Sequence, residues 1–239
     1  MPHIKLDDED TKHAITYLPL VGALIGLITC GAFRLFLYAD IPAFVKACIT
    51  VIIPIAVTGG FHIDGFLDTA DALASYRSNE KKLEILKDPH IGSFAVISFC
   101  VCILLMLGGI GVIIDDDEAP ILLSAVYMIS RALAALTSVY FDKAKPDGML
   151  AAETAKADGT MIVILVAELI FGAVFALLAR ASTVPVLAVA YALFTFIYKK
   201  TVMKNFGGVT GDTAGYYVVA SEVTAVCAVA VFYTIMKSL

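Results

Sequence analysis

Seven apolar segments dominate this sequence, and each approaches the length of about 20 residues that an α-helix needs to cross the hydrocarbon core of a membrane. The composition agrees, because 60% of the 239 residues are hydrophobic and only 16% are charged. The sequence therefore predicts an all-α polytopic membrane protein, with one integral-membrane domain over residues 1–239 and about seven transmembrane helices. The segments cover residues 14–38, 41–59, 92–114, 119–141, 161–179, 182–199 and 217–236.

Lysines and arginines are unequally divided between the two ends of these helices. Seven spans put the termini on opposite sides of the membrane, with twelve basic residues on the side of the N-terminus and only Arg180 and Lys237 on the other. Because basic residues accumulate on the cytoplasmic side, we expect the N-terminus and segments 60–91, 142–160 and 200–216 to be cytoplasmic. The twelve residues are Lys5, Lys12, Arg77, Lys81, Lys82, Lys87, Lys143, Lys145, Lys156, Lys199, Lys200 and Lys204.

The polar stretch 59–92 separates the second and third apolar segments. If it is helical from Ile63 onward, Asp64, Asp68 and Asp71 point within an arc of about 60°. Three carboxylates on one stripe repel one another and do not stabilise a helix. They suit Mg²⁺, which binds carboxylate oxygens together with water and substrate phosphate. A solvated acidic face is the alternative, but the spacing favours a metal site, to which Asp88 could add a fourth carboxylate.

His62 precedes this stripe of aspartates, and a polar run from Arg77 to Lys87 follows it. His62 lies about 160° from Asp64 if the helix already includes it. If it lies in the turn before the helix, it could reach the metal region. After the stripe, the polar run from Arg77 to Lys87 is amphipathic and predicts a helix in the cytoplasmic membrane interface.

A second polar segment, residues 204–216, contains Asp212 and four glycines. Such a segment resembles a backbone cradle for phosphate, although it lacks the Gly-Lys-Ser/Thr ending of a P-loop. An ordinary flexible connection is the alternative. Within the spans, Arg131 and Glu222 each cost several kcal/mol unless paired, so Arg131 either forms an internal ion pair or contacts phosphate. The glycines are Gly207, Gly208, Gly211 and Gly215.

These motifs together resemble one family. Residues 62–71 (HIDGFLDTAD), followed by 83–88 (LEILKD) and 91–92 (IG), resemble the signature of the adenosylcobinamide-GDP ribazoletransferases, or cobalamin synthases. Residues 207–212 with Glu222, the pair Ser130-Arg131 and residues 17–22 resemble further segments of that family. Ala72, His90 and Ala95 depart from it, since glycine, arginine and glycine are frequent at these positions, and His90 puts a phosphate contact there in doubt.

The resemblance implies a membrane transferase of cobalamin biosynthesis. The expected reaction is Mg²⁺-dependent transfer of adenosylcobinamide phosphate from adenosylcobinamide-GDP to α-ribazole or its 5′-phosphate. GMP is released, and adenosylcobalamin or its 5′-phosphate is formed. The expected location is the bacterial cytoplasmic (inner) membrane.

The resemblance also suggests roles for individual residues. Asp64, Asp68 and Asp71 are expected to bind Mg²⁺, with Asp88 or Asp212 completing the site. His62 or one of the aspartates, Asp64 or Asp68, is expected to take the proton from the 5′ hydroxyl of the ribazole. The residues expected to bind phosphate are Arg77, Lys87, Gly208 and Gly211.

Other classes of protein remain as alternatives. Intramembrane prenyltransferases and CDP-alcohol phosphotransferases also use membrane-embedded aspartates. An ion-coupled transporter would explain the charges of Arg131, Glu168 and Glu222 within spans, but the chain has no internal repeat. Nothing in the sequence is basic enough to indicate nucleic-acid binding. A homo-oligomer and a complex with other enzymes of the corrinoid pathway both stay open.

Overall fold

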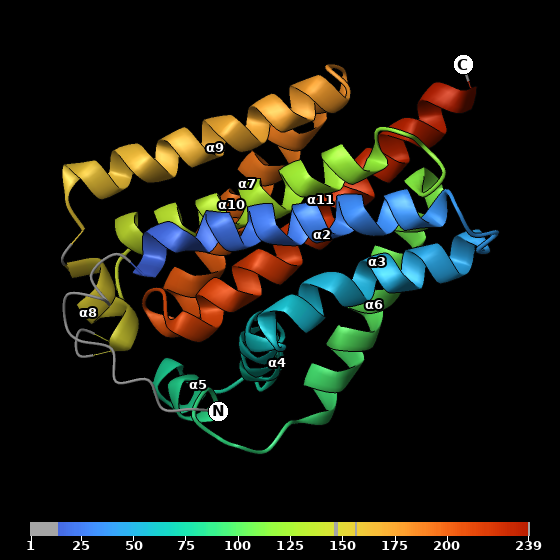
Figure 1. Cartoon of the computed structure of the whole chain (residues 1–239). Coiled ribbons are helices and arrows are strands. Elements are labelled where there is room, and N and C mark those ends of the chain that lie inside the picture. The colour runs from blue at the N-terminus through green and yellow to red at the C-terminus, as the bar shows by residue number, and fades with distance from the viewer. Residues whose placement is uncertain (1–13, 146–147, 156, 239) are drawn as a thin grey trace.

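A computed structural model of the chain describes residues 14–145, 148–155 and 157–238 (Figure 1). Within these ranges the chain is helical and contains no β-sheet, which confirms the predicted fold class. The elements are a 3-10 turn, η1 (Ala14–Tyr17), and the α-helices α2 (Leu18–Phe36), α3 (Ala43–Thr58), α4 (Phe61–Ala74), α5 (Asn79–Ile85), α6 (Ser93–Ile113), α7 (Ala119–Tyr140), α8 (Met149–Ala155), α9 (Gly159–Ala179), α10 (Thr183–Phe206) and α11 (Gly211–Ser238).

Six helical segments are long and apolar enough to cross a membrane: η1 with α2, α6, α7, α9, α10 and α11. α3 has only 16 residues and meets this criterion only together with α4, from which it is separated by a bend of 95°. The described residues therefore provide six or seven candidate spans, in agreement with the number expected. Large apolar side chains such as Leu104 in α6 and Val163 in α9 are exposed on the outside of the bundle, as contact with lipid requires.

α7 lies inside the bundle, where it packs against α2, α9 and α11. Glycines of α2 permit a close approach. A Cβ added to Gly22 would lie 2.5 Å from the Tyr127 carbonyl oxygen, and one added to Gly26 would lie 2.6 Å from the Ser124 Cβ. Small residues bring helices together in the same way in other membrane proteins.

A buried ion pair joins α7 to α11. Arg131 donates a hydrogen bond to Glu222, and the two side chains are only 1% and 6% exposed. Arg131 also donates to the Tyr127 carbonyl oxygen at 3.0 Å. The ion-pair alternative for Arg131 is therefore confirmed. Removing one member of such a pair costs roughly 3–5 kcal/mol, because the other charge is left buried.

The connection between α10 and α11 is shorter than the sequence suggested. α10 continues to Phe206 and α11 begins at Gly211, so the predicted connection over 200–216, between the spans 182–199 and 217–236, is wrong at both ends. Phe206 is buried in the core and prolongs α10. Thr210 and Thr213 exchange hydrogen bonds of 2.8 and 3.1 Å between their hydroxyls and backbone N–H groups, and this exchange starts α11 inside the expected loop.

The polar connections gather at one end of the bundle. α5, α8 and the start of α11 lie on the left and lower left in Figure 1, whereas the α6–α7 and α9–α10 connections lie at the opposite end. At that opposite end the guanidinium of Arg180 lies 2.7 Å from Glu118 and 3.2 Å from Asp116. One of the two basic residues on this side is therefore paired within the protein.

This arrangement predicts the accessibility of two loop positions. Single cysteines at Ser78, beside α5, and Ser182, before α10, should react with a membrane-impermeant thiol reagent from opposite sides of the membrane. The measurement uses sealed inside-out and right-side-out vesicles, in a background without the five native cysteines. Labelling of both positions from the same side would contradict the arrangement of the helices.

Candidate active site

The bend between α3 and α4 orients the aspartate stripe. Gly59 and Gly60 have φ angles of 59° and 81°, a left-handed conformation that glycine adopts without steric cost. They end α3 and begin α4, so that α4 turns away from α3 by 95°. Because α4 is continuous from Phe61 to Ala74, the three aspartates share one helix face, as predicted.

α4 and α11 touch through their backbones beside this stripe. A Cβ added to Gly65 would lie 2.7 Å from the carbonyl oxygen of Asp212 and 3.0 Å from its Cα. On the facing helix, a Cβ added to Gly215 would lie 3.2 Å from the carbonyl oxygen of His62. Only glycine leaves room for such an approach. Asp212, far away in sequence, is thereby placed next to the stripe.

The four carboxylates form one electrostatic cluster. Asp68 is repelled by Asp64, Asp212 and Asp71, in that order. Asp212 is in turn repelled by Asp64 and attracted by Lys145. Four like charges at a helix crossing raise the energy of the folded state unless a cation binds among them.

The donor set is chemically suited to Mg²⁺, although it is not a closed metal cage. Among the described residues, no three His, Cys, Asp or Glu side chains are grouped closely enough to hold one ion. Mg²⁺ commonly keeps several waters and uses only one or two carboxylates together with substrate phosphate. The residues present fit that mode of binding.

Asp71 also contacts the start of α6. Its carboxylate lies where a Cβ on Gly92 would be, and Gly92 is the N-cap residue of α6. The positive end of a helix dipole stabilises a carboxylate in such a position. Asp71 therefore ties the stripe to the third apolar segment in addition to its place in the cluster.

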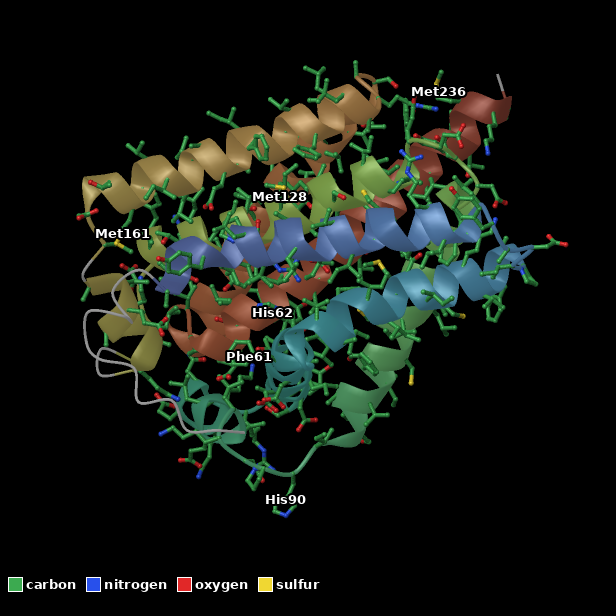
Figure 2. The ribbon with its side chains drawn as sticks, in the orientation of Figure 1. Phe61, His62, His90, Met128, Met161 and Met236 are labelled. Carbon is green, nitrogen blue, oxygen red and sulfur yellow. The ribbon has the colours of Figure 1, made fainter. Side chains whose placement is uncertain are left out.

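His62 lies inside α4, so the first of the two alternatives for it holds and it points away from Asp64. Its side chain is buried, and its Nδ1 atom has no hydrogen-bond partner among the described residues. It lines a small internal cavity together with Arg131 and Glu222, and also a larger pocket together with Asp212. Figure 2 labels it at the first turn of α4, beside the centre of the bundle.

Asp88 is not brought into the carboxylate cluster. It is exposed, and its Oδ1 accepts hydrogen bonds from the backbone N–H of His90 at 3.0 Å and from the His90 ring at 2.7 Å. These hydrogen bonds hold the pKa of Asp88 below its usual value. His90 projects away from the bundle in Figure 2. Asp88 therefore interacts with His90 in its own turn and not with the aspartates of the stripe.

The two basic residues expected to bind phosphate differ in their surroundings. Arg77 is exposed, and its backbone N–H donates weakly to Ser75 at 3.4 Å. Lys87 is also exposed, but it lies close enough to Lys145 to repel it. Lys87 therefore lies nearer to the site than the sequence alone could indicate.

The two glycines expected to bind phosphate also differ. Gly208 faces the backbone of residues 142–144, where any added Cβ would overlap backbone atoms, and its neighbour Val209 pairs with the same segment. Gly211 has open space around it and begins α11. Of these two glycines, only Gly211 is accessible to a ligand.

Lys145 is a further candidate site residue, which the sequence indicated only as one of the basic residues on the cytoplasmic side. Burial and the nearby Lys87 lower its pKa, and Asp212 opposes this effect. It lines the same pocket as His62 and Asp212. The sequence signal that could have singled it out is its position in the polar segment 142–160, on the same predicted side as the stripe.

Known proteins resemble this chain over nearly its whole length. The sequence model of the cobalamin-5-phosphate synthase family matches residues 1–230. An adenosylcobinamide-GDP ribazoletransferase from Lachnoclostridium phytofermentans is 35% identical over 232 residues, which cover 97% of this chain and 88% of the relative. One from Geobacillus kaustophilus is 33% identical over 211 residues, which cover 86% and 80%. The chain belongs to the adenosylcobinamide-GDP ribazoletransferase family. No solved structure matches it.

Membership of the ribazoletransferase family decides between the classes left open by the sequence. The matched range contains the stripe, Asp212 and Glu222, so the resemblance seen in short motifs extends over the whole domain. The prenyltransferase, CDP-alcohol phosphotransferase and transporter alternatives lose their support. The buried charges of Arg131 and Glu222 satisfy each other, which removes part of the reason for considering a transporter.

The crossing of α4 and α11 predicts which glycines of this ribazoletransferase tolerate a side chain. Gly65→Val should destabilise the fold by at least about 1–3 kcal/mol, the usual cost of overpacking, and should abolish turnover. Gly211→Val should fold normally, because nothing lies within 4 Å of the added Cβ. Thermal unfolding in detergent measures both variants. Gly108→Val, on the open face of α6, is the matched control. Wild-type stability of Gly65→Val would contradict the close crossing.

Proposed function

We propose that this membrane protein transfers adenosylcobinamide phosphate from adenosylcobinamide-GDP to α-ribazole or to α-ribazole 5′-phosphate. The reaction releases GMP and forms adenosylcobalamin or its 5′-phosphate, a late step of cobalamin biosynthesis. The observation that carries this proposal is the family match over residues 1–230, supported by relatives of the same name that cover most of the chain.

The bonds that change define what the site must do. A ribose hydroxyl of the acceptor attacks the phosphorus bonded to adenosylcobinamide, a new O–P bond forms, and the P–O bond to GMP breaks. The proton of the hydroxyl passes to a base. In a product that carries a 5′-phosphate, the 5′ oxygen of the ribose is already esterified. For the phosphorylated acceptor, the expectation that the base acts on the 5′ hydroxyl is therefore wrong, and another ribose hydroxyl attacks.

The carboxylate cluster accounts for the expected dependence on Mg²⁺. Asp64, Asp68, Asp71 and Asp212 are the residues that would hold the ion. When bound, it offsets the negative charge that gathers on the diphosphate during transfer. The protein's own contribution is to hold carboxylates from two distant segments in one place, through the contact of Gly65 with the backbone of Asp212.

Two kinds of residue can accept the proton. Asp64 is exposed and Asp68 is partly exposed, so either can serve an acceptor bound on the stripe. His62 has an unpartnered Nδ1 and lines the pocket beside Asp212, so it can serve an acceptor bound there. A general base must first lie within hydrogen-bond reach of the proton that it accepts, and its pKa is considered only after that. The side from which the acceptor binds therefore decides between them.

The orientation proposed for the protein places the active site in the bacterial cytoplasm, where a soluble acceptor can reach it. Nine of the twelve basic residues of that side lie in described segments, and Lys5, Lys12 and Lys156 lie outside them. α5, α8 and the start of α11 share one end of the bundle (Figure 1). Basic residues at the same end as the site support a cytoplasmic assignment.

Substitution of either Asp64 or Asp68 should remove most of the transferase activity. Asp64→Asn and Asp68→Asn are each expected to lower GMP release by at least ~10²-fold, the scale seen when a transition-state charge loses its stabiliser. The assay contains adenosylcobinamide-GDP, α-ribazole and saturating Mg²⁺. Thermal stability without metal should be equal or higher, because each substitution removes a charge from the repelling cluster.

Asp117→Asn, in the turn at the opposite end of the bundle, is the matched control and should retain activity. Unchanged turnover of both stripe variants would show that the stripe is not the site. If the wild type instead consumed a prenyl diphosphate and ignored adenosylcobinamide-GDP, the function itself would be wrong.

A further inference from the structure

A pocket of about 410 Å³ lies beside Asp212. It is lined by residues of η1, α4, α8 and α11, with Leu18 of α2, Ser138 of α7 and the connections that precede α8 and α11. Asp64, Asp68 and Asp71 do not line it, so Asp212 is the carboxylate common to the pocket and the cluster. The lining is partly apolar, with Phe61 and Leu150 among its side chains. Its titratable side chains are His62, Lys145, Glu153 and Asp212.

Among the described residues, the pocket is lined by one basic side chain, Lys145, and by the carboxylates of Asp212 and Glu153, so the favourable position for an anion is at Lys145. Lys145 is partly buried and repelled by Lys87, with Asp212 as the opposing charge. Lys87 does not line the pocket, but it lies near enough to Lys145 to add to the attraction for a phosphate bound there. α11 starts at the same place, and Gly211 leaves its first turn open. The positive end of a helix adds to the attraction for a phosphate.

Two side chains of the first turn of α4, His62 and Phe61, also line this pocket. His62 is only 8% exposed, and its Nδ1 has no hydrogen-bond partner among the described residues. A buried polar atom without a partner carries a free-energy cost, and His62 lines both this pocket and the smaller cavity beside Arg131. Phe61, on the same rim, is 69% exposed and offers a flat apolar face on which an aromatic base can stack.

The size of the pocket distinguishes between the two substrates. Pockets of roughly 300–1,000 Å³ take small organic ligands, and about 410 Å³ is near the lower end of that range. A nucleoside phosphate fits such a volume. A corrinoid is several times larger than a nucleoside, so the donor suits the open face of the stripe instead.

We propose that this pocket is the acceptor site, and that Lys145 binds the 5′-phosphate of a ribazole-type nucleoside 5′-phosphate. The inference rests on the proposed function. With the phosphate held at Lys145, the base can stack on Phe61, and the ribose lies between Lys145 and Asp212. His62, which lines the same pocket, is then a candidate for the general base, acting on a hydroxyl other than the phosphorylated one. Lys145 makes the enzyme prefer the phosphorylated acceptor.

The test compares two acceptors with the same enzyme. In Lys145→Gln, the ratio of kcat/KM for α-ribazole 5′-phosphate to that for α-ribazole should fall about tenfold or more, since a hydrogen bond to a charged group contributes about 1.5–3 kcal/mol. Lys145→Arg should restore the ratio. Lys143→Gln is the matched control, because the Lys143 ammonium donates to the carbonyl oxygens of Phe141 and Val139 and does not line the pocket.

Direct binding separates this inference from the function on which it rests. Calorimetric titration of α-ribazole 5′-phosphate into the detergent-solubilised protein, without donor, should give a Kd that Lys145→Gln weakens about tenfold. An unchanged acceptor ratio and an unchanged Kd would overturn the inference. Equal losses with both acceptors would also overturn it, because Lys145 would then bind the donor diphosphate. If the wild type released no GMP with either acceptor, the proposed function would fail instead.

Discussion

The contact between Gly65 of α4 and the backbone of Asp212 is the constraint on which the site depends. A turn of α4 and the first turn of α11 contact each other with no side chain between them. This contact adds a fourth carboxylate to the three of the stripe. Asp212 also lines the pocket that contains Lys145, which the three aspartates of the stripe do not line.

A second interaction holds the helix that carries Asp212. The buried pair of Arg131 and Glu222 links α11 to the central helix α7 within the apolar part of the bundle. Both side chains are almost fully buried, so each charge depends on the other. A buried pair of this kind stabilises one register between α7 and α11, and we infer that it fixes how far the start of α11 reaches toward α4.

Much of this could be predicted from the sequence, because hydropathy and helical spacing are local properties. The apolar segments and the shared face of the aspartates follow from runs of residue types and from 100° per residue. The start of α11 at Gly211 was missed because the hydrogen bonds of Thr210 and Thr213 override the loop-like composition. The proximity of Lys145 to Lys87 and Asp212 could not be predicted from the sequence, because these residues are neighbours only in the fold.

The central claim is that Asp68 of α4 and Asp212 of α11 act in one site. A double-mutant cycle on kcat/KM tests it most directly, with Asp68→Asn, Asp212→Asn and the double variant assayed at fixed Mg²⁺. If the two carboxylates act together, the loss in the double variant will be smaller than the product of the single losses, with a coupling free energy of at least about 0.5 kcal/mol. Losses that multiply without coupling would contradict a site shared between the two helices.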